Sequence, residues 1–127
     1  MQGKFVLNPT PSYSERMSST RGEIRRIMQQ QLREITGDDV AVMRYNTYWK
    51  DIVTRYRVVI QGWPQDVPFR NLSDVSNLGK LDILLQGWQS GTIRFRHITD
   101  EEYEFLSAER AAGHEIWGGN AMAAWDE

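Results

Sequence analysis

The fold prediction starts from Thr92-Ile93-Arg94-Phe95-Arg96-His97-Ile98, in which residues of the inner and outer face alternate strictly. This period of two predicts a half-buried strand with Arg94 and Arg96 on its solvent face. Upstream, Val58-Val59-Ile60 predicts a second short strand, which ends at Gly62-Trp63-Pro64 because proline lacks a backbone donor. A helical pattern separates the two strands, so we expect them to pair across the domain with helices packed on them.

Helical periodicity on both sides of the strands predicts the order α-α-β-α-β-α. The second helix is predicted from residue 38 or 39 to about 56, and the third from residue 73 or 77 to about 89. The last helix is predicted to begin at the capping box Thr99-Asp100-Glu101-Glu102 and to end at about Ala112. The predicted fold class is therefore α+β, a small helix-dominated domain with a short two-stranded β pair.

The first helix is predicted to begin at a second capping box, Thr20-Arg21-Gly22-Glu23, and to end at about Thr36, before Gly37. Its apolar positions recur at helical spacing and predict one core-facing side. The opposite side is basic and polar, and it carries Arg25, Arg26, Gln29, Gln30 and Arg33.

Composition divides the chain into three segments. Residues 1–19 are rich in Pro and Ser and predict a flexible lead-in, residues 20–113 a single globular domain, and residues 114–127 an acidic tail that contains Gly, Ala and Trp. Residues 1–98 hold 14 Lys or Arg against 9 Asp or Glu, and residues 99–127 hold 1 against 8; the balances of +5 and −7 sum to the net charge of −2. A basic body with an acidic end suits nucleic-acid binding, although an unevenly charged solvated surface has the same pattern.

The residue types that carry most enzyme chemistry are either missing from the sequence or have a predicted structural role. The chain has no cysteine, which excludes disulfides, thiolate metal sites and a cysteine nucleophile. His97 lies on the predicted inner face of its strand, which favours a core histidine. The acidic pairs at Asp38-Asp39 and Asp100-Glu101 stand at helix N-termini, where negative charge is favourable. No nucleophile or phosphate-loop motif occurs. We therefore expect a non-enzymatic domain with no cofactor and no metal.

Hydropathy predicts a protein without a membrane partner. No apolar run approaches the roughly 18 residues of a membrane span, and the apolar stretch at the start is too short for a signal peptide. The expected location is intracellular, with the nucleus as a candidate compartment.

Aromatic residues between positions 45 and 63 have two interpretations. Tyr45, Trp49 and Tyr56 share a helical stripe with apolar neighbours, so the core is the better account of those three. Tyr48 and Trp63 fall outside the stripe, and we expect these two to be available for binding, for example as a stacking platform beside arginines.

Two motifs carry a resemblance to a known family. Gly62-Trp63-Pro64 is followed by Val67-Pro68-Phe69-Arg70-Asn71, and a Leu-rich helix then ends in Ser90-Gly91. Over about residues 45–98 the chain resembles an uncharacterised domain that recurs in predicted proteins of mushroom-forming (basidiomycete) fungi, with Gly-Trp-Pro and Pro-Phe-x-Asn motifs. It departs from that pattern at Leu72, where the family has proline. The resemblance implies a fungal intracellular protein and structural roles for Trp63 and Phe69, and it supplies no catalytic residue.

Our first functional hypothesis is a regulatory DNA-binding domain with an arginine-rich surface, because a planar guanidinium suits phosphate. The residues predicted to form that surface are Arg25, Arg26, Arg33, Arg55, Arg57, Arg94 and Arg96. The alternative is a protein–protein interaction or homodimerisation module that uses the first amphipathic helix and the Trp-bearing tail. Convergence of the arginines into one patch favours nucleic acid, and scatter favours a protein partner.

Overall fold

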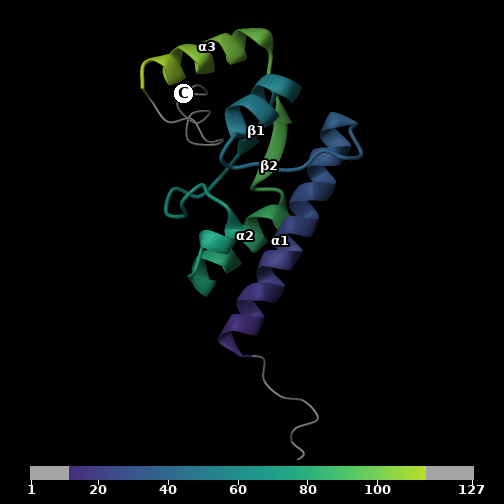
Figure 1. Ribbon diagram of the computed structural model, residues 1–127, viewed down its shortest axis with the longest axis vertical. Coiled ribbons are helices and arrows are strands. Elements are labelled where there is room, and N and C mark those ends of the chain that lie inside the picture. Colours follow the sequence, from purple (N-terminus) through teal and green to yellow (C-terminus); the bar gives the residue numbers. More distant parts are fainter. Residues whose placement is uncertain (1–11, 114–127) are drawn as a thin grey trace, which may run out of the picture.

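The computed structural model describes residues 12–113 and confirms a helix-dominated α+β fold (Figure 1). The elements in chain order are α1 (Tyr13–Thr36), a π-helical turn (Trp49–Thr54), β1 (Val58–Gln61), a 3-10 turn (Leu72–Asp74), α2 (Leu78–Ser90), β2 (Arg94–His97) and α3 (Asp100–Ala111). Residues 1–11 and 114–127, which include the predicted Trp-bearing tail, lie outside the described part of the chain.

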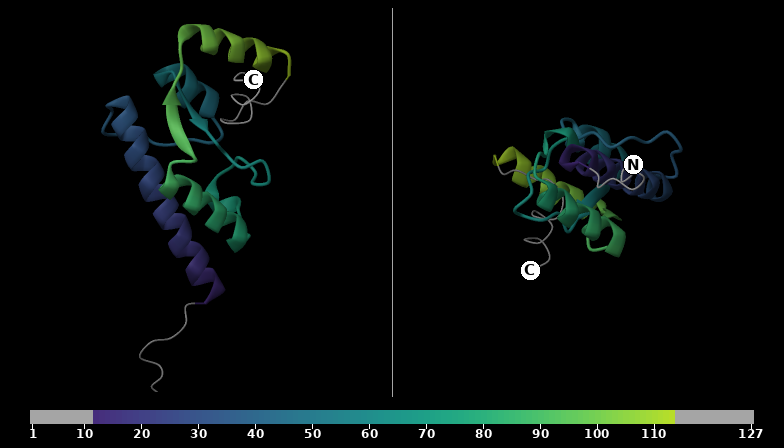
Figure 2. Two further views of the ribbon diagram at one scale, coloured as in Figure 1. Left: turned by 180° about the vertical axis from the view of Figure 1, so that it is seen from behind. Right: turned by 90° about the horizontal axis from the view of Figure 1, so that it is seen from below.

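The two strands form the predicted pair at the centre of the fold, and the pair is antiparallel. Ile60 is opposite Phe95, and Val59 is opposite Arg96. The helix α1 runs along one edge of the molecule in contact with α2 and β2, and α3 lies across the far end of the sheet from α2 (Figures 1 and 2). The sheet is too short to be stable alone; α1 packs on β2, and the π-helical turn packs on β1.

The first helix begins earlier than predicted. Ser12 caps α1, and the capping box is Ser12 with Glu15, whose carboxylate accepts a hydrogen bond from the Ser12 amide at 2.8 Å. Met17 is buried, and the Tyr13 hydroxyl accepts a hydrogen bond from the Leu78 amide at 3.0 Å. The prediction of a flexible lead-in is therefore wrong for residues 12–19, because the box at Thr20 lies inside a helix that tertiary contacts extend.

The second helix is shorter than predicted. Residues 39–47 form turns, because the Asp38 side chain and carbonyl accept hydrogen bonds from the amides of Val40 and Ala41 and close a turn in place of a helix N-terminus. The helical segment that follows is π-helical over Trp49–Thr54. A π turn brings residues five apart onto one side, so Tyr48 and Val53 are both buried.

The aromatic residues that we expected to be available for binding belong to the core. Tyr48 and Trp63 are 5% and 3% exposed, so this expectation is wrong. Trp63 packs edge-on against Phe69 with a centroid distance of 5.0 Å, and its indole N–H donates to the Val67 carbonyl at 2.9 Å. The Tyr48 hydroxyl accepts from the Ile60 amide at 2.9 Å. The two motifs between positions 62 and 71 thus lock the loop after β1 onto the core.

Gly62 makes that loop possible. Its φ of +88° is in the left-handed region that favours glycine, and a Cβ atom there would lie 2.0 Å from the Thr92 carbonyl oxygen. Backbone contact at this point leaves no room for any side chain.

The strand β2 differs from the predicted alternation in two respects, one on each face. Phe95 is buried and Arg94 is exposed, as predicted, but His97 is exposed and Arg96 is partly buried. The ladder itself continues to His97, which is opposite Val58. The burial pattern changes after Phe95 because Arg96 contacts Glu102 of α3, whose N-terminus is capped by Thr99. The predicted capping box of Thr99 with Glu102 is confirmed.

The core face of α2 provides a stability prediction. Leu84 is fully buried, whereas Leu85, which the spacing in the sequence places in the core, is partly exposed. Leu84→Ala is expected to lower the free energy of unfolding by about 2–5 kcal/mol, because it removes buried methyl groups and leaves a cavity. Leu85→Ala is the matched control and should cost clearly less in chemical denaturation. An equal or larger cost at Leu85 would contradict this orientation of the helix.

Candidate functional site

The side of α1 that faces away from the core gathers the cationic and carboxamide residues of the helix. Its buried positions are Met17, Ile24, Met28 and Leu32. The opposite side lines a shallow depression of about 670 Å³. We call this surface the outward face, and it consists of Gly22, Arg25, Arg26, Gln29, Gln30 and Arg33.

The three arginines of the outward face differ in how strongly the domain engages them. Arg25 is exposed, and its side chain makes no hydrogen bond or ion pair with other residues of the 12–113 segment. Arg26 donates twice to the Glu23 carboxylate, at 2.7 and 3.1 Å, and this hydrogen bonding lowers the pKa of Glu23. Arg33 donates through Nε to the Ala41 carbonyl at 3.1 Å and holds the turn after α1. Glu34 and Asp39 lie at the margin of the depression.

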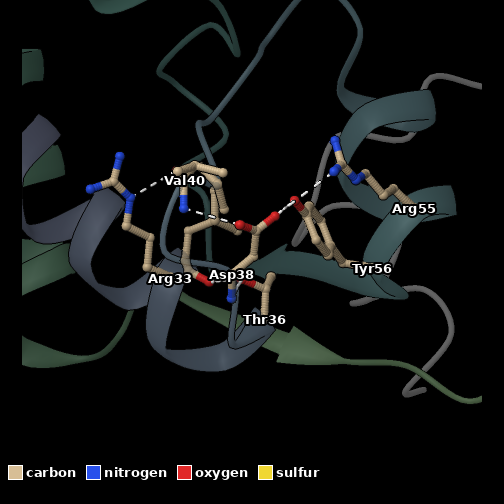
Figure 3. A network of polar contacts seen from close by, with 8 residues as sticks. Arg33, Thr36, Asp38, Val40, Arg55 and Tyr56 are labelled. Atoms are coloured by element: carbon tan, nitrogen blue, oxygen red, sulfur yellow. Dashed lines mark hydrogen bonds and ion pairs between the residues drawn. The ribbon is translucent and has the colours of Figure 1, made fainter.

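Arg55 lies in a polar network at the end of α1 (Figure 3). Asp38 is its centre: the Tyr56 hydroxyl donates to one carboxylate oxygen at 2.6 Å, and an Arg55 nitrogen lies 3.8 Å from the same oxygen. The hydrogen bond from Tyr56, the bond from the Val40 amide and the charge of Arg55 hold the pKa of Asp38 below its usual value. Arg55 therefore serves a local structural network that closes the 38–56 segment.

Arg57 is used at the junction of β1 and α3. It is the one non-glycine residue of the described chain with positive φ, +54°, a conformation that costs about 1–3 kcal/mol. Its guanidinium lies 3.6 Å from the centre of the Tyr103 ring, donates to the Thr54 carbonyl at 2.7 Å and lies 3.6 Å from the Asp100 carboxylate. These contacts turn the guanidinium towards the protein.

Arg96 is also committed to an internal contact. It donates to Glu102 at 3.0 Å, with 27% of the Arg96 side chain and 11% of the Glu102 side chain exposed. The expectation that Arg96 projects into solvent is therefore wrong, because Glu102 in the first turn of α3 binds its guanidinium. Arg94 is exposed and makes no hydrogen bond or ion pair within residues 12–113.

The seven arginines do not form one patch. Arg25, Arg26 and Arg33 share the outward face of α1. The other four lie elsewhere: Arg55 beside Asp38, Arg57 and Arg96 against α3, and Arg94 on β2. By the convergence criterion, the α1 trio is the part of the predicted set that stays a candidate for phosphate contact.

The pair of Arg96 and Glu102 predicts a pH dependence of stability. Burial raises the pKa of Glu102, but hydrogen bonds from Arg96 and Thr99 outweigh it and leave the pKa below the usual 4.5. Because the folded-state pKa is depressed, this pair stabilises the fold above pH 4.5, and the contribution is lost as the pH falls through the folded pKa.

Glu102→Gln removes the negative charge but keeps a side-chain oxygen that can accept the hydrogen bond from the Thr99 amide. We expect it to lower the free energy of unfolding at neutral pH by about 1–3 kcal/mol. The difference from the unmodified protein should shrink as the pH falls below 4.5. Urea denaturation at several pH values measures it, and a difference that does not vary with pH would contradict the ion pair.

A second depression, of about 550 Å³, lies between α1 and residues 42–47, and we call it the groove. Its lining includes two arginines, Arg25 and Arg44, and contains no Asp or Glu. Tyr45 crosses towards α1, where its hydroxyl contacts the Met28 sulfur at 3.4 Å. Sequence reasoning missed this site because it predicted a helix through residues 42–47, and the turn chemistry of Asp38 was the signal that could have revealed a loop.

Residues 12–113 contain neither a group of three or more His, Asp or Glu side chains that could hold a metal ion nor a helix long and apolar enough to cross a membrane. Comparison of the chain with protein-family models, with curated proteins and with solved structures gives no match. The resemblance to the fungal domain therefore stays a prediction.

Proposed function

We propose that this protein is a non-catalytic nucleic-acid-binding domain, with DNA as the expected ligand, and that the outward face of α1 contacts the nucleic acid. One observation carries the proposal: three arginines, two glutamines and an exposed glycine line one depression on the outer side of a 24-residue helix.

The residue types on this face suit both parts of a duplex. Arginine binds phosphate oxygens and pairs with guanine, and glutamine pairs with adenine in the major groove. An α-helix fits the width of that groove. At 1.5 Å per residue α1 is about 36 Å long, and it lies along an edge of the molecule (Figure 1). A long duplex can therefore approach the helix from outside.

The glycine at position 22 favours an external ligand, because nothing inside the domain requires a glycine there. Glycine inside a helix costs roughly 0.5–1 kcal/mol relative to alanine. A Cβ atom at Gly22 would meet nothing within 4 Å, and its φ is not in the left-handed region. Internal packing therefore does not require this glycine. A ligand that approaches the helix backbone closely would require it.

The alternative function is a protein interaction module that uses the same helix, for a partner protein or a second copy. It is favoured by the engagement of Arg55, Arg57 and Arg96 in contacts with acidic residues of the domain, which leaves a small cationic surface. Sedimentation of the protein over a range of concentrations tests self-association directly.

The experiment is a titration of a fluorescein-labelled duplex of about 20 base pairs, followed by anisotropy at about 50 and 200 mM salt. Log affinity should fall with log salt by about 0.9 for each phosphate contact by arginine, so three contacts predict a slope of about −2.7. Gly22→Ala is expected to raise thermal stability and to weaken DNA binding. A variant that is more stable and binds DNA as well as the unmodified protein would contradict close approach at Gly22.

A further inference from the structure

The groove between α1 and residues 42–47 carries positive charge that its own lining does not neutralise. Arg25 has no hydrogen-bond or ion-pair partner within residues 12–113. Arg44 lies 3.9 Å from Asp51, and 61% of its side chain is exposed. The neighbouring depression on the outward face, by contrast, includes Glu34 and Asp39. The groove therefore favours an occupant with negative charge.

The remaining lining residues favour a peptide. Gln29 and Asn46 bring carboxamides, which donate and accept at once and so can pair with backbone peptide groups. Val42, which is 43% exposed, and the partly buried Met43 and Tyr45 bring apolar surface. The volume of about 550 Å³ is within the usual range of ligand sites, about 300–1,000 Å³. A short segment with carboxylates and one large apolar side chain matches all these features.

The same chain contains a segment of that composition directly after the described part. Residues 114–127 include Glu115, Asp126 and Glu127, no Lys or Arg, and two tryptophans. Fourteen residues can span up to about 46–50 Å, which exceeds the length of α1, about 36 Å. A segment that starts after Gly113 can therefore extend over a distance greater than the length of α1.

We propose that residues 114–127 bind in the groove, with carboxylates on Arg25 and Arg44 and a tryptophan against the apolar lining. Because the segment is tethered to the domain, its effective concentration is high and a weak intrinsic affinity suffices for occupancy. Charge complementarity selects this occupant, since the lining of the groove has two cations and the segment has three carboxylate side chains.

Occupancy of the groove has a consequence for the outward face, and this step rests on the proposed function. Arg25 and Gln29 line both the groove and the outward-face depression. A carboxylate on Arg25 competes with phosphate for the same guanidinium. The segment would therefore oppose nucleic-acid binding, and its release would increase the affinity.

The test uses a labelled peptide of residues 114–127, acetylated and amidated so that its charges are those of the side chains. The binding protein is the chain truncated after Gly113. It keeps all the elements from α1 to α3 and the buried cluster from Met17 to Leu106, so we expect it to fold without the segment, and a cooperative thermal melt checks this. Anisotropy at low salt is expected to show saturable binding. Arg44→Ala should weaken it by about tenfold or more, as expected for loss of a charge-assisted hydrogen bond.

Three controls make the result specific. Arg94→Ala removes an exposed arginine outside the groove and should leave peptide affinity unchanged. Arg44→Lys should restore part of the affinity that Arg44→Ala loses. A peptide with Glu115→Gln, Asp126→Asn and Glu127→Gln should bind at least about tenfold more weakly. Thermal melting of each variant checks that the fold is retained.

Absence of saturable binding, or equal binding by the Arg44→Ala protein, would overturn the proposal. These titrations contain no nucleic acid, so their outcome is independent of the proposed function. In a separate titration with duplex DNA, the truncated chain should bind more tightly than the full chain. If the peptide binds but the truncated and full chains bind DNA with equal affinity, the competition between segment and DNA is contradicted. The binding of the segment in the groove is then still supported.

Discussion

Trp63→Ala is expected to lower the free energy of unfolding by about 3–5 kcal/mol, the cost of removing a large aromatic side chain from a core. The indole is 3% exposed and packs against Phe69 and Tyr45 with centroid distances of 5.0 and 6.3 Å. Its N–H donates to the Val67 carbonyl. Loss of the ring removes these contacts and leaves that buried carbonyl without its donor, so urea denaturation should show a large shift.

Trp63→Phe separates the ring from the hydrogen bond. It keeps most of the aromatic contact with Phe69 and loses the bond to Val67, and we expect a cost of about 1–3 kcal/mol. An alanine variant as stable as the unmodified protein would show that Trp63 is a surface aromatic available for ligands, in contradiction to the packing around the Gly62-Trp63-Pro64 turn.

Local signals in the sequence predicted the elements that depend on local chemistry. The strand pair follows from the β-branched run at 58–60 and the alternation around Phe95, and the capping box of Thr99 with Glu102 defines the start of α3. The start of α1 could not be chosen in this way, because Ser12 and Thr20 both open a capping-box pattern. Contacts of Tyr13 and Met17 with the rest of the fold favour the earlier one.

Tertiary contacts determine the parts that periodicity predicted wrongly. A stripe with 3.6 periodicity from Val42 to Tyr56 predicted one continuous helix, whereas a loop and a π turn are present. The π turn rotates Tyr48 into the core, a change that no single-residue preference reveals. In α2 the spacing predicted Leu85 as a core residue, whereas Leu84 is the fully buried residue in the fold.

The candidate site was partly predictable. Exposed arginines on α1 follow from helix periodicity, and Arg94 follows from strand alternation. The engagement of Arg57 with Tyr103 and of Arg96 with Glu102 depends on the placement of α3 against the sheet. Contacts between residues far apart in the sequence cannot be read from local patterns. The number of arginines in the sequence therefore overestimates how many are available to bind phosphate.

The second large effect concerns the outward face of α1. Replacing Arg25 and Arg26 together with glutamate puts negative charge where the proposal places phosphate, and each lost arginine removes about 0.9 from the salt slope. We expect DNA affinity to fall by at least about 100-fold at low salt. Both side chains are exposed, and the ion pair of Arg26 with Glu23 is on the surface, so thermal stability should change little.

The matched control reverses two exposed cations elsewhere, Lys50 and Arg94, and changes the net charge by the same amount. The deciding measurement is the anisotropy titration of labelled duplex DNA with the unmodified protein and both double variants at low salt. We expect tight, salt-dependent binding by the unmodified protein. The variant with Lys50→Glu and Arg94→Glu should bind nearly as well, and the variant with Arg25→Glu and Arg26→Glu should show no detectable binding. Equal loss in the two double variants, or no binding by the unmodified protein, would contradict this expectation.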